Sequence, residues 1–160
     1  MDSDLDRVDI AIAERLQRDG RLSNTRLAEQ VALSEASCWR RQKRLEERGL
    51  IEGYQAILNR RKLGLGVMAF VQISCHEHSE EVTAQFERII QAAPQVLSCH
   101  NTTGEADYLL QVVARDLDSY SRFVEKVLRT LPGVSSIRSN LSLRELKTDN
   151  RLPVSELVSL

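Results

Sequence analysis

Residues 34–54, SEASCWRRQKRLEERGLIEGY, concentrate basic side chains in a chain of 160 residues whose formal net charge is only −1. Five Lys and Arg lie between Arg40 and Arg48. On a helix, five side chains of this stretch fall within about 60° of one direction: Ser37, Arg40, Arg41, Arg44 and Arg48. Cys38 and Leu45 lie together about a quarter-turn away. The spacing therefore predicts one apolar stripe that packs against the protein and, next to it, one basic stripe that can bind anions.

The chemistry of this stripe fits DNA, because arginine neutralises phosphates and pairs with guanine O6 and N7 in the major groove. The alternative is a solvated helix face. Arg40, Lys43 and Arg44 can meet Glu46 or Glu47 at spacings of three or four residues. The charge pattern alone leaves both interpretations open, since a basic helix is a weak signal until a fold presents it.

The elements before this stretch support the DNA interpretation. Apolar residues recur at helical spacing over 5–19, and Ser23 can cap a short second helix. Ser34 can cap a third helix that ends at Gly49. The following LIEGYQAILN favours a two-stranded hairpin around Gly53. Together these elements predict a winged helix-turn-helix, with the third helix in a major groove and Gly53–Gln55 bracing the DNA backbone.

The second half changes its hydrophobic period. Strands are predicted over 67–75, 96–102, 107–114 and 135–143, and helices over 80–93 and 117–131. The order βαββαβ, with x-x-Pro-x-Val-x-Ser repeated after each helix, predicts a ferredoxin-like sandwich. The fold class is therefore α+β. One sheet face with Phe70 and Leu109 lacks a cover, which predicts self-association.

The balance of charged residues changes at the same point in the chain as the hydrophobic period. Residues 1–62 hold 13 Lys and Arg against 11 Asp and Glu, and residues 63–160 hold 9 against 12. We expect a DNA-binding domain with its hinge over 1–62, NRRKLGLG marking the hinge, and an effector-binding and oligomerisation domain over 63–160.

The run NTTGEADYLL, residues 101–110, brings hydroxyls, amides and a carboxylate to one loop. Gly104 permits a sharp turn between Thr102 and Asp107. As plain structure this is a hairpin in which Asp107 satisfies turn amides. The same groups are those that a zwitterionic amino acid needs, with a negative group for its ammonium and donors for its carboxylate.

Other functions have weaker support. Cys75, His76, His78 and His100 are metal-ligand types, but without a repeated spacing we expect no metal site and no cofactor. Three cysteines without a CxxC pair indicate reduced thiols. Catalytic motifs are absent from the sequence, so an enzyme is not expected. The apolar runs are too short for a membrane span, and we expect a cytoplasmic protein.

The sequence also resembles the Lrp/AsnC (leucine-responsive, or feast/famine) family of transcription factors. The similarity extends from LDRVDIAIAERL through SCWRRQKRLEERGLIEGY to GEADYLL and LPGVSSIRSNLSLRELK. It implies double-stranded DNA as partner, a small-molecule effector such as an amino acid, and homodimers that assemble further, often to octamers. Two departures stand out: SEASC replaces the family's Ser-Pro/Thr-x-Pro-Cys, and Gln42 stands where an aliphatic residue is usual.

The GEADYLL run resembles the family's Gly-Asp-x-Asp-Tyr effector loop, with Glu105 in place of the first aspartate, and Asn140 and Leu141 match positions of the same cleft. The predicted effector-binding residues are Thr102, Thr103, Gly104, Glu105, Asp107, Tyr108, Asn140 and Leu141. The predicted DNA-binding residues are Ser23, Ser34, Ser37, Arg40, Arg41 and Arg44. Our hypothesis is a regulator of transcription that responds to an amino acid or related metabolite. The alternative is an oligomeric metabolite sensor without sequence-specific DNA binding.

Overall fold

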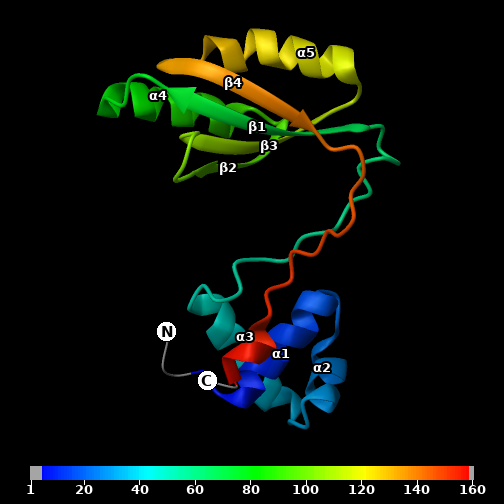
Figure 1. The fold of residues 1–160 in the computed structure, drawn as a ribbon. Helices are drawn as coiled ribbons and strands as arrows, with labels where there is room; N and C mark the ends of the chain where they lie inside the picture. The colour runs from blue at the N-terminus through cyan, green and yellow to red at the C-terminus, as the bar shows by residue number, and fades with distance from the viewer. Residues whose placement is uncertain (1–4, 159–160) are drawn as a thin grey trace. The chain divides into compact units, whose positions relative to one another are not determined.

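The chain forms two compact units in a computed structural model that describes residues 5–158 (Figure 1). One unit combines Met1–Ile57 with Lys147–Leu160, and the other is Leu58–Leu146. The chain therefore connects the two units twice. Within residues 5–158, no helix is long and apolar enough to cross a membrane.

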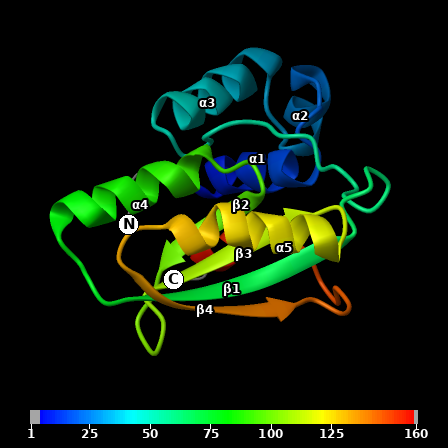
Figure 2. The ribbon, with the colours of Figure 1, turned by 90° about the horizontal axis from the view of Figure 1, so that it is seen from above.

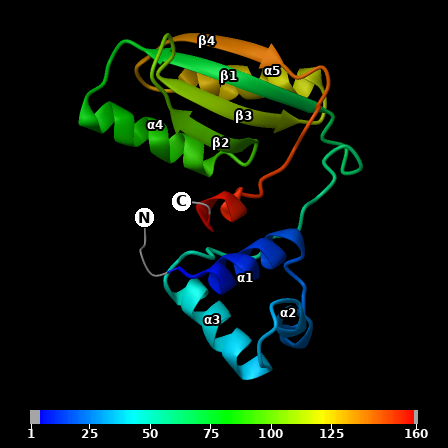
Figure 3. The ribbon, with the colours of Figure 1, turned by 60° about the horizontal axis from the view of Figure 1, so that its bottom comes forward.

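Three helices build the first unit: α1 (Arg7–Arg18), α2 (Asn24–Gln30) and α3 (Glu35–Glu47) (Figure 3). Side-chain oxygens cap each start, from Asp6, Ser23 and Ser34 respectively. The core side chains are fully or almost fully buried: Ile12, Leu16, Leu27, Ala28, Cys38 and Leu45. The predicted helices and their helix-turn-helix order are confirmed.

The predicted wing hairpin is not formed. Residues 52–59 carry neither strand nor helix, and Ile57 and Leu58 are exposed. The physical reason is the lack of a turn sequence such as Asn-Gly that would fix a two-residue hairpin. Ile51 is held by its N–H, which donates to Leu45 O at 3.2 Å. The segment beyond it runs as a connection toward the second unit.

The C-terminal tail belongs to the first unit. Gln17 on α1 donates its side-chain N–H to Leu152 O (3.2 Å) and accepts from Leu152 N–H (2.7 Å). The short 3-10 helix η2 (Val154–Val158) follows and contacts α1. The predicted second domain, residues 63–160, included this tail, because no periodic pattern in the tail points to α1.

We expect Gln17→Ala to lower the free energy of unfolding of the first unit by about 1 kcal/mol, since both hydrogen bonds to the tail are lost. Urea unfolding followed by the fluorescence of the single tryptophan, Trp39, measures this unit directly. Gln30→Ala, an exposed glutamine at the end of α2, is the control. Equal stability of the two variants would contradict the tail contact.

The second unit is an antiparallel sheet with two helices on one face (Figure 2). Its elements are β1 (Val67–Cys75), α4 (Glu80–Ala92), β2 (Val96–Asn101), β3 (Tyr108–Ala114), α5 (Leu117–Lys126), the 3-10 helix η1 (Leu128–Thr130) and β4 (Val134–Leu141). The strand order is β2-β3-β1-β4, with β1 paired to both β3 and β4. The predicted ferredoxin-like βαββαβ fold is confirmed.

Alternation along the strands separates the two sheet faces. Ala69, Val71 and Ile73 of β1 are fully buried under the helices. Phe70, between them, points to the other face and is 41% exposed. It lies opposite Gln111 of β3 and Asn140 of β4 in the strand register. The face without helices is therefore apolar at its centre, as the sequence predicted.

Candidate nucleic-acid interface and ligand loop

Helix α3 is fixed at both ends and along one side. At its start, the Ser34 hydroxyl accepts the Ser37 N–H (3.3 Å), and past its end Gly49 takes a φ of +70°. Cys38 and Leu45 anchor its inner side in the core. Ser34 thus positions the helix, and Ser23 does the same for α2 by accepting the Arg26 N–H.

Two arginines of α3 are held by carboxylates of the same unit. Arg41 Nη1 contacts Asp6 Oδ2 (2.7 Å) and Asp9 Oδ1 (2.9 Å), and Arg44 Nη2 contacts Asp9 Oδ2 (2.5 Å). Asp9 is fully buried. The predicted roles of Arg41 and Arg44 in DNA binding stay predictions. In this geometry both side chains link α3 to α1 through Asp9.

The pKa directions agree with this ionic contact. Hydrogen bonding to Asp9 and Asp6 raises the pKa of the Arg41 guanidinium. The backbone N–H of Asp9 and then Arg41 lower the pKa of the Asp6 carboxyl, against the opposing effect of burial. The charged forms of both partners are therefore favoured.

The remaining cations of the stretch differ in availability. Arg40 is exposed and makes no ion pair with any residue from 5 to 158. Lys43 pairs with Glu46 at 2.8 Å, as the solvated-face alternative anticipated. Ser37 is half-buried beside this surface. Among the six predicted DNA contacts, Arg40 has the geometry best suited to one.

Gln42 and the segment after α3 form a polar support for the helix. Gln42 Nε2 donates to Tyr54 Oη (2.9 Å) and to Glu46 Oε1 (3.1 Å), and Tyr54 Oη donates to Glu46 Oε1 (2.9 Å). Burial and the neighbouring Glu46 raise the pKa of the Tyr54 hydroxyl. Tyr54, in the region expected to brace DNA, thus supports α3.

The β2–β3 loop is stabilised mainly by its own backbone. Thr102 N–H donates to Asp107 O, the Thr102 hydroxyl donates to Ala106 O, both at 2.9 Å, and Gly104 takes a φ of +121°. Asp107 Oδ2 accepts the N–H of Cys75 on β1 at 2.7 Å. Asp107 therefore ties the loop to the sheet, and the amide that it satisfies belongs to β1 and not to the turn.

A hollow of about 350 Å³ lies beside this loop, on the sheet face without helices. Its lining comes from the loop and from two strands: Gln72, Thr102, Thr103, Glu105, Ala106 and Leu109. Glu105 Oε2 lies 3.6 Å from Nη1 of Arg138 on β4, and their side chains are 93% and 70% exposed. The acid Glu105 thus lines the hollow, and the base Arg138 lies next to Glu105.

Not every predicted effector residue reaches this hollow. Tyr108 is buried, and its ring stacks on Phe86 of α4 with centroids 4.3 Å apart. Asn140 lies on the same sheet face but next to Phe70, and Leu141 alternates to the opposite face. Sequence reasoning missed Gln72, Leu109 and Arg138. The alternation of β1 and β3, which places Gln72 opposite Leu109, was the available signal.

The histidine-rich end of β1 does not assemble a metal site. Within the described part of the chain there is no group of three or more His, Cys, Asp or Glu that could hold a metal ion. His78 Nε2 lies 3.9 Å from Asp107 Oδ1. His78, just after β1, therefore lies beside Asp107 of the β2–β3 loop.

Comparisons with known proteins point the same way. Residues 5–52 match the winged helix-turn-helix DNA-binding family, and residues 68–152 match the Lrp/AsnC ligand binding domain. The chain is 38% identical over 151 residues to the leucine-responsive regulatory protein of Escherichia coli, covering 94% of this chain and 92% of that protein.

Solved structures extend the likeness to three dimensions. A transcriptional regulator from Neisseria meningitidis in complex with L-Met has a TM-score of 0.91 and 39% identity, covering 96% of this chain and 99% of that one. An AsnC family transcriptional regulator from Agrobacterium tumefaciens has the same TM-score and coverage at 31% identity.

Proposed function

The chain belongs to the Lrp/AsnC family of transcriptional regulators, and from this premise we propose that its α3 enters the major groove while a free amino acid binds beside the β2–β3 loop. It is a DNA-binding regulator and not an enzyme. The observation that carries the DNA proposal is Arg40, which is exposed and pairs with no acid among residues 5–158, on a helix whose opposite side packs in the core. The alternative without sequence-specific DNA binding is disfavoured by the match over residues 5–52.

The hollow beside the loop supports an amino acid as effector. An α-ammonium needs a carboxylate and an α-carboxylate needs cationic or N–H donors; Glu105 lines the hollow, and Arg138 lies 3.6 Å from Glu105. The Neisseria regulator was solved with L-Met, which agrees with this class of ligand. Thr102 and Thr103 add hydroxyls to the same lining.

The open sheet face supports a homodimer that assembles to a higher oligomer, up to the octamer that the family resemblance implies. An exposed apolar centre such as Phe70 is covered when two copies pack face to face. Two copies of α3 could then reach two half-sites of double-stranded DNA, which in a bacterial cell lies in the cytoplasm. Effector binding regulates only if it favours one assembly over another.

We expect Arg40→Ala to weaken DNA binding by about five- to 150-fold, because a good arginine–guanine contact contributes about 1–3 kcal/mol. Gel shifts on DNA from upstream of the protein's own gene, at several salt concentrations, measure it. Arg129→Ala, an exposed arginine of the second unit, should leave the shift unchanged. A wild-type protein that gives no salt-dependent shift would sink the DNA proposal.

For the effector, we expect isothermal titration calorimetry against the twenty amino acids to show binding by a small subset. Glu105→Gln and Arg138→Gln should each weaken that binding by about five- to tenfold, since each removes a charge-assisted hydrogen bond. Arg144→Gln, a few residues further along the chain, is the matched control. If both site variants bind as tightly as the wild type, the effector lies elsewhere.

A further inference from the structure

The outward surface of α3 is not the arginine stripe that its sequence indicated. It includes the exposed side chains of Ala36, Trp39, Arg40 and Lys43, with exposed Glu47 one turn beyond Lys43. These side chains lie within an arc of about 100°, from Trp39 at one edge to Arg40 at the other. The stripe containing Arg41 and Arg44 is turned toward α1 by the contacts with Asp9. The surface available to a major groove is therefore partly apolar.

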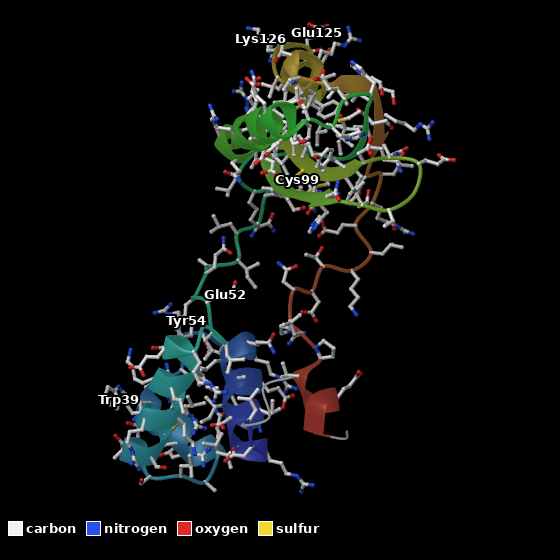
Figure 4. All side chains as sticks on the ribbon, turned by 90° about the vertical axis from the view of Figure 1, so that its left-hand side faces the viewer. Trp39, Glu52, Tyr54, Cys99, Glu125 and Lys126 are labelled. Atoms are coloured by element: carbon white, nitrogen blue, oxygen red, sulfur yellow. The ribbon has the colours of Figure 1, made fainter. Side chains whose placement is uncertain are left out.

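Trp39 dominates this surface. It is the only tryptophan of the chain, and 53% of it is exposed. Figure 4 shows it projecting from α3 on the side away from α1. A tryptophan that served only the core of this unit would be buried like Leu45. Exposing so large an apolar ring on the face of a DNA-reading helix calls for a contact outside the unit.

We propose that Trp39, together with Ala36, reads the C5 methyl group of thymine in the major groove, beside the base contacted by Arg40. Thymine alone among the DNA bases presents a methyl group there, and apolar side chains recognise it by contact. Ala36 lies three residues before Trp39 and four before Arg40, so the apolar and cationic groups face adjacent base pairs. The assignment rests on the proposed entry of α3 into the major groove.

The position of Trp39 along α3 supports a base contact over a phosphate contact. Lys43 follows Trp39 by one turn and is held by Glu46. Arg40 directly follows Trp39, about 100° around the helix, and makes no ion pair with any residue from 5 to 158. Trp39 and Arg40 both lie in the N-terminal half of α3 (Glu35–Glu47), which is the part of a recognition helix that contacts base edges.

The test replaces thymine by deoxyuridine, which removes only the methyl group. A high-affinity site is first selected in vitro from random duplexes with the wild-type protein, and each thymine is then substituted in turn. Wild-type affinity is expected to fall by about fourfold at one or two positions of each half-site. Trp39→Ala is expected to bind the thymine site roughly tenfold more weakly and to lose the distinction between thymine and uracil there.

Leu50→Ala is the matched control, because Leu50 is an exposed apolar residue of the same unit that lies just beyond α3. It should keep both the affinity and the methyl preference. Circular dichroism melts confirm folding of both variants. The inference is overturned if the wild type binds thymine and uracil sites equally at every position, or if Trp39→Ala retains the preference. A wild type that selects no site would instead count against the proposed DNA function.

Discussion

Replacing Asp9 with alanine is expected to lower the free energy of unfolding of the N-terminal unit by about 2–3 kcal/mol. The Asp9 carboxylate is fully buried and faces two guanidiniums, Arg41 at 2.9 Å and Arg44 at 2.5 Å. Removing one partner of a buried ion pair leaves the other charge uncompensated, which ordinarily costs about 3–5 kcal/mol. The smaller value applies because both arginines retain contact with water.

Urea unfolding followed by Trp39 fluorescence measures this effect in the unit that contains it. Glu14→Ala is the control, because Glu14 lies on the same helix and pairs with Arg18 at 2.6 Å on the surface. An exposed pair of this kind contributes roughly 0.5 kcal/mol or less. If Asp9→Ala and Glu14→Ala cost the same, the buried carboxylate does not hold α3 to α1.

The Asp9 contact also explains where sequence reasoning about α3 succeeded and where it failed. The repeat of Cys38 and Leu45 correctly predicted a helix with one packed side. A helical wheel cannot decide which flank of the cations meets a neighbouring helix, because that depends on how α1 crosses α3. The acid that attracts Arg41 and Arg44 stands some 30 residues away in the sequence. The arginine stripe of the helical wheel therefore lies about a quarter-turn from the surface that α3 exposes on the side away from α1.

In the β2–β3 loop, too, the sequence predicted local features but not the partners that other elements supply. Gly104 and the hydroxyls of Thr102 and Thr103 were identified from local sequence, because a sharp turn needs a glycine at positive φ. Local sequence did not show that Asp107 contacts β1 or that Tyr108 contacts α4. Arg138 is brought opposite Gln72, a residue that lines the hollow, by the pairing of β4 with β1. Contacts between residues that strand pairing brings together cannot be read from the sequence of one segment alone.

Replacing Phe70 with lysine is expected to raise the dissociation constant of the proposed dimer at least 100-fold. Phe70 is the exposed apolar centre of the sheet face without helices, between Gln111 and Asn140. In a face-to-face dimer each lysine ammonium would be buried near the same lysine of the other copy. An unpaired buried charge costs roughly several kcal/mol. Sedimentation equilibrium measures the change in assembly.

DNA binding should fall with the assembly, because two linked copies of α3 bind two half-sites with an affinity that one copy lacks. Loss of that linkage is expected to weaken binding to a full site by roughly 100-fold, while binding to a single half-site stays unchanged. Leu117→Lys is the control, since Leu117 is an exposed leucine at the start of α5, on the layer that covers the opposite face. Should Phe70→Lys keep both the assembly and the full-site affinity, the dimer forms through another surface. The half-site measurement separates that outcome from damage to α3 itself.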